Sequence, residues 1–305
     1  MRTLIEQSDM LIDKMHTNYV RDLLYTIKWD YRLIGIKGSR GAGKTTLLLQ
    51  YLKLHPELNA LYVSMDDLYF GTHTLLDLAS RMAREGWTHL FADEVHLYAN
   101  WSQEVKLIYD RYPELHVVFT GSSLLSIAKG KGDLSRRAHT YTMYGLSFRE
   151  YLNLTYGTDF QVLDLASILK NHRAHARHIR QKIKPLAHLD AYMEKGYYPF
   201  FLEDPDFYLA KLRQSTQVVL DVDLPYAVHV EIRNVHRLKQ LLQIVAESVP
   251  FTPNIKKLSE RLNIDRNSLK FYLHHLHEAM LIYNLYSGQK GISQLTKPEK
   301  VYLQN

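Results

Sequence analysis

Eight residues near the start of the chain have the types and spacing of a phosphate-binding loop. Residues 38–45 follow the pattern GxxxxGK[ST], from Gly38 to Lys44 and Thr45. Glycines let the backbone wrap a phosphate closely, and successive N–H groups together with a helix N-terminus supply aimed positive dipoles. We therefore expect a nucleoside triphosphate, ATP or its product ADP, to contact Gly38, Ser39, Arg40, Gly41, Ala42, Gly43, Lys44, Thr45 and Thr46.

An acidic pair follows a later apolar run and completes the expected chemistry. Lys44 is predicted to neutralise the β- and γ-phosphates, while Thr45 and Asp93 hold Mg²⁺. Glu94, the next residue, is placed to orient and deprotonate an attacking water. A solvated strand end is the alternative interpretation of the pair. Arg40 is expected to brace the loop or a nearby carboxylate instead of binding phosphate.

Two further residues extend the predicted site. Thr120, after an apolar run at residues 117–119, is the candidate for sensing the γ-phosphate, with Ser122 in reserve. A turn, or a helix cap by Ser122, is the alternative. Arg137 is the candidate for stabilising charge in the transition state, from its own or a neighbouring subunit, against a surface role for Arg136 and Arg137.

These residues need a scaffold in which strands and helices alternate. Apolar runs predict strands over residues 32–37, 60–64, 89–92, 115–120 and 139–143, and helices over 10–29, 44–54, 75–85 and 101–112. Such alternation predicts an α/β P-loop NTPase domain with a mainly parallel sheet over residues 1–155. A helical lid is expected over 156–250, where apolar runs thin out.

The last segment predicts a winged helix-turn-helix over residues 251–305. Helices are expected over 256–262 and 268–280, with strands at 281–286 and near Val301. Arg266, Asn267, Lys270 and His274 are predicted to face outward, with Lys290 on the wing. DNA binding is one interpretation, and docking on the ATPase or on another protein is the other. The basic stretch at residues 170–184 is interpreted as a solvated helix, with nucleic acid or an acidic partner as alternatives.

Composition sets broad limits. The 305 residues carry a formal net charge of +6 and include no cysteine, which excludes disulfides and favours a reducing compartment. No apolar run approaches the roughly 20 residues that span a bilayer. The expected protein is therefore cytoplasmic, without a membrane partner.

The motifs resemble those of a prokaryotic group of AAA-type P-loop ATPases related to the STAND and origin-recognition-like ATPases. The resemblance is carried by the loop at residues 38–48, the segment 91–96, the segment 119–124 and an end-of-domain signature at 145–151. Looser matches are a turn at 196–199 and an acidic segment at 221–223. Arg137 takes the group's arginine position, and Arg136 stands where the group has glycine. Members usually continue into a C-terminal domain of unknown function, and the ending at residues 301–305 resembles a strand cut short.

The resemblance implies an ATP-hydrolysing molecular switch whose nucleotide state controls how the winged helix docks. A homo-oligomer or a protein partner is compatible with this expectation. Two alternatives remain: a DNA-binding regulator that holds nucleotide with little turnover, and a small-molecule kinase using the same loop. A residue placed to activate water, Glu94, favours hydrolysis over transfer to a small molecule.

Overall fold

The first half of the chain is an α/β domain built on five parallel strands. The computed structural model describes all residues except 124–133, 135, 226–231, 249–251, 287–297 and 305. The strands lie in the order β2-β3-β4-β1-β5. They are β1 (Leu33–Gly38), β2 (Ala60–Ser64), β3 (His89–Asp93), β4 (His116–Ser122) and β5 (His139–Met143). The predicted mainly parallel sheet is confirmed, and each expected strand is present within two residues of its predicted limits.

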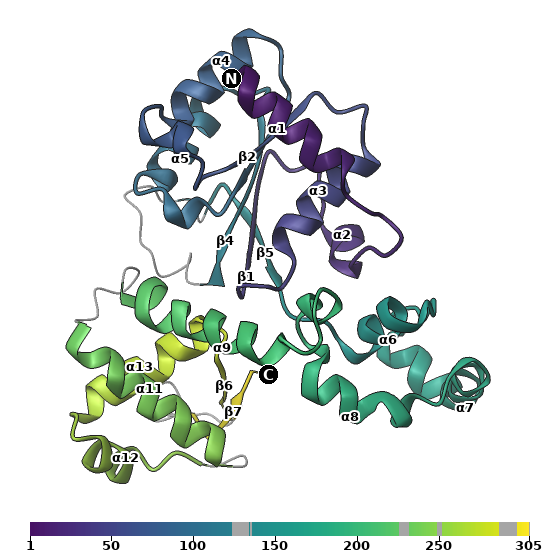
Figure 1. Cartoon of the computed structure of the whole chain (residues 1–305), viewed down its shortest axis with the longest axis vertical. Coiled ribbons are helices and arrows are strands. Elements are labelled where there is room, and N and C mark those ends of the chain that lie inside the picture. Colours follow the sequence, from purple (N-terminus) through teal and green to yellow (C-terminus); the bar gives the residue numbers. More distant parts are fainter. Residues whose placement is uncertain (124–133, 135, 226–231, 249–251, 287–297, 305) are drawn as a thin grey trace.

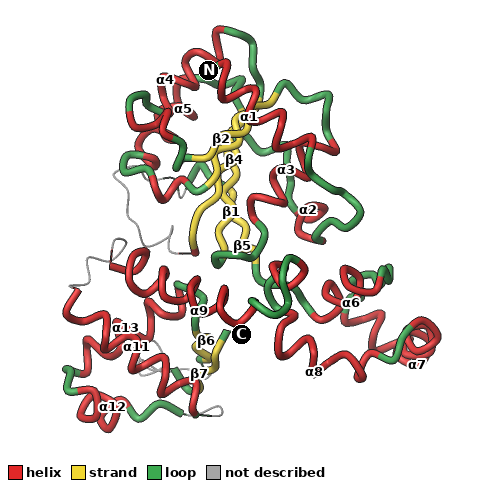
Figure 2. The backbone as a smooth tube through the Cα atoms, in the orientation of Figure 1, coloured by secondary structure: helices red, strands yellow, loops and turns green. Residues whose placement is uncertain are grey.

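Helices cover both faces of this sheet because alternate strand residues are apolar on each side. Ile34 and Ile36 pack on one face with α3 (Lys44–Leu54) and Leu24 of α2 (Asp22–Thr26). Leu33 and Val117 pack on the other face with α4 (Leu75–Arg84) and α5 (Trp101–Arg111). Short η1 (Leu68–Gly71) and η2 (Val95–Leu97) connect these elements. Figure 2 shows the strands enclosed by helices.

The predicted helix over residues 10–29 is wrong. The structure has α1 (Arg2–Asp13), a non-helical segment, and then the short α2. Gln50 stabilises the non-helical segment, because its side-chain amide donates to the backbone carbonyls of His16 and Tyr19, both at 2.8 Å. The non-aromatic apolar residues from Leu11 to Ile27 all pack on one hydrophobic cluster, although they come from two helices and the segments next to them.

A helical region follows the sheet and has its own small core. It contains α6 (Phe148–Tyr156), α7 (Leu165–Lys182), η4 (Pro185–His188), α8 (Leu189–Ala191), η5 (Tyr192–Gly196) and η6 (Pro199–Leu202). Aromatic residues dominate the core, among them Tyr151, Phe160, Phe201 and Tyr208. This region corresponds to the first part of the predicted lid.

The rest of the described chain, residues 208–304, is here called the C-terminal module. It packs around a core of its own. It contains α9 (Tyr208–Val218), η7 (Val219–Asp223), α11 (Ile232–Glu247), α12 (Ile255–Leu262), α13 (Arg266–Glu278) and the antiparallel pair β6 (Ile282–Leu285) and β7 (Lys300–Leu303). The apolar residues of α12 and α13 that pack in this core are Ile255, Leu258, Leu262, Leu269, Tyr272, Leu273 and Leu276, all of them buried. Val219 and Leu241 belong to the same cluster, so the predicted domain limit at 250 runs through a continuous core.

Two sets of surface features in the C-terminal module can be compared with expectation. Arg266, Asn267 and His274 are exposed and Lys270 is partly exposed, as predicted for the outward face of α13. Lys290, predicted on the wing, lies outside the described residues. In the part of the chain that is described, no helix combines the length and apolarity needed to cross a bilayer.

Candidate nucleotide-binding site

The phosphate loop joins β1 to α3 in the strand–loop–helix context that its pattern requires. Gly41 and Gly43 adopt left-handed backbone conformations, with φ of 78° and 96°. Glycine adopts such values without the steric cost that a Cβ imposes. The turn closes on itself through a hydrogen bond from the Ala42 N–H to the Ser39 carbonyl (3.3 Å). Free N–H groups of the first turn of α3, which includes the exposed Thr46, therefore stand at the mouth of the loop.

Lys44 points back into the loop and towards the acidic pair. Its ammonium donates to the carbonyls of Gly38 (3.2 Å) and Ser39 (3.3 Å) and lies 3.6 Å from Oε1 of Glu94. Only 4% of the Lys44 side chain is exposed, so its positive charge is poorly screened by water. A buried cation next to a glycine-rich turn is the arrangement that a phosphate group complements.

Asp93, at the end of β3, is the centre of a hydrogen-bond network. Its Oδ2 accepts from the Thr45 hydroxyl (2.6 Å) and from the Tyr62 hydroxyl (2.9 Å). Its Oδ1 accepts from the Thr120 hydroxyl and from the Glu94 N–H (3.1 Å). Four donors fix the carboxylate, and burial followed by the charge of Asp93 raises the pKa of Tyr62. The tyrosine therefore stays protonated and keeps donating.

Glu94 and His96 flank the open side of this network. Glu94 has a left-handed backbone (φ 54°), and its side chain is about one-fifth exposed. Oε2 of Glu94 lies 3.5 Å from Nε2 of His96, while Nδ1 of His96 accepts from the Ser122 N–H (3.3 Å). Burial lowers the pKa of His96, which keeps the ring neutral with its proton on Nε2. Within the described residues that buried nitrogen has no hydrogen-bond partner.

The phosphate loop is braced from the C-terminal module. Arg40 donates two hydrogen bonds to Asp223, from Nε at 2.9 Å and from Nη2 at 3.1 Å. Asp223 is nearly buried in η7, and its hydrogen bond raises the pKa of Arg40. The prediction that Arg40 braces a carboxylate is confirmed, and the carboxylate belongs to the acidic segment at residues 221–223.

Aromatic residues of the predicted turn at 196–199 lie directly against the loop. A Cβ at Gly41 would come within 2.7 Å of the Phe200 ring, and one at Gly43 within 3.8 Å of Pro199. The Tyr198 hydroxyl interacts with Ser39, and burial raises the pKa of Tyr198 to about 12. The helical region therefore contacts the loop over several residues.

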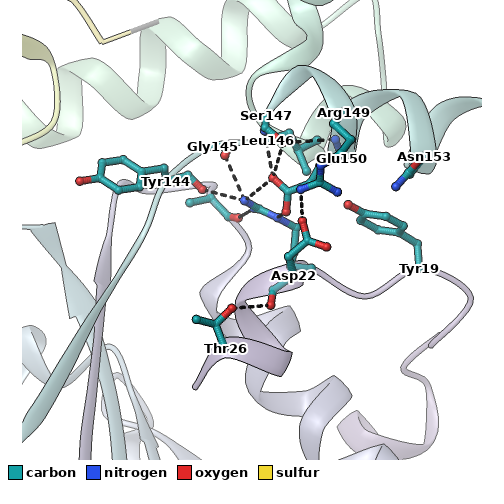
Figure 3. A network of polar contacts seen from close by, with 12 residues as sticks. Tyr19, Asp22, Thr26, Tyr144, Gly145, Leu146, Ser147, Arg149, Glu150 and Asn153 are labelled. Carbon is teal, nitrogen blue, oxygen red and sulfur yellow. Dashed lines mark hydrogen bonds and ion pairs between the residues drawn. The ribbon is translucent and has the colours of Figure 1, made fainter. Parts of the chain in front are cut away.

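A second ion-pair network supports the loop from behind (Figure 3). Arg21 pairs with the buried Glu150 at 2.7 Å and also donates to the Ala42 carbonyl at 3.1 Å. Glu150 in turn caps α6 by accepting from the Ser147 N–H (3.0 Å). Beside it, Arg149 pairs with Asp22. The end-of-domain signature thus forms ion pairs of both polarities with the segment that precedes β1.

Most predicted site residues converge, and one does not. Lys44, Thr45, Asp93, Glu94 and Thr120 form one connected cluster at the carboxyl ends of β1, β3 and β4. Arg137 precedes β5, at the amino ends of the strands, and forms a bidentate pair with Asp110 of α5 at 3.0 and 3.3 Å. Placing Arg137 in the site of its own chain was therefore wrong. The phosphate loop follows β1, whereas Arg137 precedes the parallel β5, so the length of a strand lies between them.

Sequence reasoning missed Tyr62 and His96. Tyr62 is a mid-strand residue of β2, and only the strand order places its hydroxyl beside Asp93. His96 belongs to the motif at residues 91–96, but the motif alone assigns it no role. Its polar side chain two places after Glu94 is the signal in the sequence that could have indicated a site residue.

The donors present suit a magnesium–triphosphate complex. Hydroxyl and carboxylate oxygens, the ligands that Mg²⁺ prefers, come from Thr45 and Asp93, whose side chains already touch. Nε2 of His96, which has no hydrogen-bond partner within the described ranges, offers a donor beside Glu94. The residues therefore fit the expected cofactor.

Comparison with known proteins agrees with this geometry. A family model described as an AAA domain matches residues 30–152, from just before β1 into α6. Residues 30–152 are an AAA domain. A second model, described only as a domain of unknown function, matches residues 186–305. It covers the end of the predicted lid and the whole predicted winged helix.

Sequence and structure relatives of the AAA domain and its continuation are distant. An uncharacterized protein of Methanocaldococcus jannaschii is 27% identical over 88% of this chain, which spans 60% of that relative's length. AMPPCP-bound DnaA from Aquifex aeolicus is 14% identical, with 84% and 85% of the two chains covered and a TM-score of 0.32. The Hsp104–ADP complex of S. cerevisiae is 14% identical, covering 90% of this chain and 39% of that one at a TM-score of 0.34. At scores of this size no function follows from these likenesses.

Proposed function

We propose that the chain is an ATP-hydrolysing switch whose nucleotide state changes how the C-terminal module sits on the AAA domain. The observation that carries the hydrolysis is the gathering of Lys44, Thr45, Asp93 and Glu94 at the mouth of one phosphate loop. Lys44 neutralises the β- and γ-phosphates. In this assignment the Lys44–Glu94 contact is exchanged for contacts to phosphate when ATP enters.

Thr45 and Asp93 would hold Mg²⁺, which supplies positive charge to the phosphate oxygens when it is bound. Tyr62 and Thr120 keep the Asp93 carboxylate oriented for that task. Thr120 also accepts the Glu94 N–H at 3.1 Å, so it links the two acidic residues. A shift of the γ-phosphate is thereby transmitted to β4, which is the form of sensing that we assign to Thr120.

Glu94 acts as the base that orients and deprotonates the attacking water. Its carboxylate is the exposed part of the cluster, and the neutral His96 offers an N–H beside it. Water between these two groups would accept from His96 and donate to Glu94. The pairing holds the carboxylate in one direction, as a general base requires.

The switch rests on the Arg40–Asp223 pair. Asp223 lies in η7, whose Val219 and Leu220 belong to the core of the C-terminal module. Phosphate bound within the loop attracts Arg40 and competes with Asp223 for the guanidinium. A change at the nucleotide therefore biases the docking of the whole module, as a two-state interface can.

We assign α12, α13 and the β6–β7 pair to a winged helix. Exposed Arg266 and His274 and the partly exposed Lys270 give α13 a modest cationic face. Two functions suit that face, duplex DNA binding and docking on a protein. Only Arg266 and the partly exposed Lys270 are permanent cations, which favours the second function, because non-specific DNA affinity depends on the number of neutralised phosphates.

Phosphate release with Mg²⁺ and ATP tests the proposal. Glu94→Gln is expected to bind ATP normally and to lower kcat by about 10²–10⁴-fold, the usual contribution of a general base. Exposed Glu114→Gln is the matched control and should leave kcat unchanged. Unchanged hydrolysis in Glu94→Gln would exclude the mechanism. No hydrolysis in the wild-type chain would support the regulator with little turnover, and transfer of label to a small acceptor would support the kinase.

Arg137 enters the proposal only as a residue of a neighbouring subunit. In that role Arg137→Ala and Glu94→Gln would each be inactive, because each lacks one half of a shared site. Mixing the two purified variants should restore part of the phosphate release, since some interfaces then combine an intact Arg137 with an intact Glu94. Activity that stays absent on mixing, or Arg137→Ala with wild-type activity, removes Arg137 from the catalytic set.

A further inference from the structure

Helix α7 carries a row of exposed cations. None of its residues is buried, and Figure 1 shows it at the outer edge of the helical region, away from the C-terminal module. Lys170, Arg173, Arg177 and Arg180 are all exposed. Their spacing of three, four and three residues places them on one face of a helix. A kink at Asn171 separates Lys170 from the other three.

This row, here called the arginine face (Arg173, Arg177 and Arg180), has no acidic residue on its own helix. No Asp or Glu occurs anywhere between Leu165 and Leu189. In the described part of the chain, Lys182 forms the ion pair of α7, with Asp159. Lys182 lies about half a turn of the helix away from the arginine face. Three guanidinium groups at one side of a helix repel one another and raise the local positive potential.

A neighbouring side of the same segment is already occupied. Ile179 and the adjoining Ile183 pack against the aromatic core of the helical region. An interfacial membrane helix inserts a free apolar face into the lipid. Because these two side chains pack inside the protein, they are not free to enter lipid, and the most exposed large apolar residues of α7, Leu165 and Leu169, lie before its kink at Asn171.

We propose that the arginine face of α7 binds the phosphate backbone of double-stranded nucleic acid. Guanidinium groups bind phosphate through paired N–H donors, and their span of seven residues covers about 10 Å. A duplex presents one negative charge per about 1.7 Å of its axis, so all three arginines reach phosphates at once. The face has no aromatic side chain on which unpaired bases could stack, which favours a duplex over a single strand. Contact with phosphates alone makes the binding independent of base sequence.

Salt dependence measures these contacts directly. Fluorescence anisotropy with a labelled 20-base-pair duplex of arbitrary sequence, without nucleotide, is followed from 50 to 200 mM KCl. The slope of log K against log salt changes by about 0.9 for each phosphate contact. Replacing Arg173, Arg177 and Arg180 by Gln should lower the slope by about 2.7, so over this range the wild type loses about 40-fold more affinity than the variant.

Four controls make the result specific. Arg81→Gln, Arg84→Gln and Lys28→Gln together remove the same charge from exposed positions elsewhere and should leave the slope nearly unchanged. The variant Arg266→Gln with Lys270→Gln tests whether α13 supplies the binding instead. Thermal melting checks that each variant folds, which is expected because the substituted side chains are at the surface. Glu94→Gln should bind the duplex normally, so failure here is separate from failure of the ATPase proposal.

Several outcomes would overturn the proposal. These are absence of duplex binding by the wild type at 50 mM KCl, equal slopes for the arginine-face variant and the wild type, or equal loss in the charge-matched control. Binding to poly-glutamate or to phosphatidylserine vesicles that exceeds duplex binding, and that is lost in the arginine-face variant, would assign the face to an acidic protein or a membrane instead.

Discussion

Arg40 and Asp223 are 183 positions apart in the sequence and form two hydrogen bonds, at 2.9 and 3.1 Å. One is in the phosphate loop, and the other is in the core of the C-terminal module. Asp223 is 4% exposed and Arg40 is 30% exposed. We therefore expect the contribution of this pair to stability to lie between that of an exposed ion pair and that of a fully buried one.

Removing Arg40 should destabilise the contact between the two halves. Arg40→Ala leaves a nearly buried carboxylate unpaired, and we expect a loss of about 2 kcal/mol in the free energy of unfolding, between the values for exposed and buried pairs. Adding Asp223→Ala should recover part of the loss, because the orphaned charge is removed. Urea unfolding of the double-mutant cycle measures this coupling.

Asp221→Asn is the control, because the Asp221–Lys239 pair is exposed and should contribute less than about 1 kcal/mol. Strict additivity of the two substitutions would contradict the coupling.

Contact between Gly41 and Phe200 predicts a specific steric effect. Gly41→Ala adds a methyl group 2.7 Å from the ring at a φ of 78°, so both unfolding stability and ATP affinity should fall. Gly86→Ala has nearly the same φ, 79°, with nothing within 4 Å of the added atom. It isolates the backbone cost, about 1–2 kcal/mol. Phe200→Ala should rescue the additional loss in Gly41→Ala. Equal losses in the two glycine variants would show that the ring yields freely.

Tyr62 should matter to hydrolysis although it lies outside the phosphate loop. Tyr62→Phe keeps the ring and removes one of the four donors to Asp93, which should cost about 1.5–3 kcal/mol, as for hydrogen bonds to charged groups. Phosphate release should slow because the carboxylate is held less firmly. Tyr25→Phe, at an exposed position, is the control for hydroxyl removal. Unaltered stability and kcat in Tyr62→Phe would exclude the assigned role.

Acid should destabilise the C-terminal module through His275. Burial lowers the pKa of His275 to about 4, from 6.5 in the unfolded chain. The unfolded state therefore binds more protons below pH 6.5, and stability falls as the pH drops from 6.5 towards 4. Between pH 7.5 and 5.5 this single group should lower the free energy of unfolding by about 1 kcal/mol.

A leucine at this position tests that cause. His275→Leu removes a ring nitrogen that has no hydrogen-bond partner among the described residues, and it leaves an apolar side chain in the core. Its urea midpoint should change less between pH 7.5 and 5.5 than that of the wild type. An identical pH dependence in the two proteins would assign the acid sensitivity to other groups, such as His89, whose pKa burial also lowers to about 4.

Local signals were enough for the sheet and the loop. Apolar runs ending on Gly38, Asp93 and Ser122 are short, continuous and bounded by turn residues, so their positions could be predicted within two residues. Parallel strands bring their carboxyl ends to one edge. The meeting of Lys44, Asp93 and Thr120 therefore followed from the strand assignment.

Contacts across long sequence separations could not be predicted in the same way. Placing Tyr62 at Asp93 requires the strand order, and pairing Arg40 with Asp223 requires the position of η7 on the loop. Arg137 was misplaced because a position in the sequence before β5 does not say at which end of the sheet the side chain lies. The parallel pairing of β5 with β1 decides at which end the side chain lies. It places residues that precede β5 far from the phosphate loop.

The Arg21–Glu150 pair sets a lower limit on the size of a fragment that folds independently. The family model begins at residue 30, after Arg21, yet Glu150 lies inside it. A fragment cut at residue 30 would keep a carboxylate whose side chain is 8% exposed and lose its cation. Breaking a buried pair in this way costs about 3–5 kcal/mol, a large share of the stability of a small domain. The autonomous folding unit therefore begins upstream of residue 21, and the N-terminal segment belongs to it.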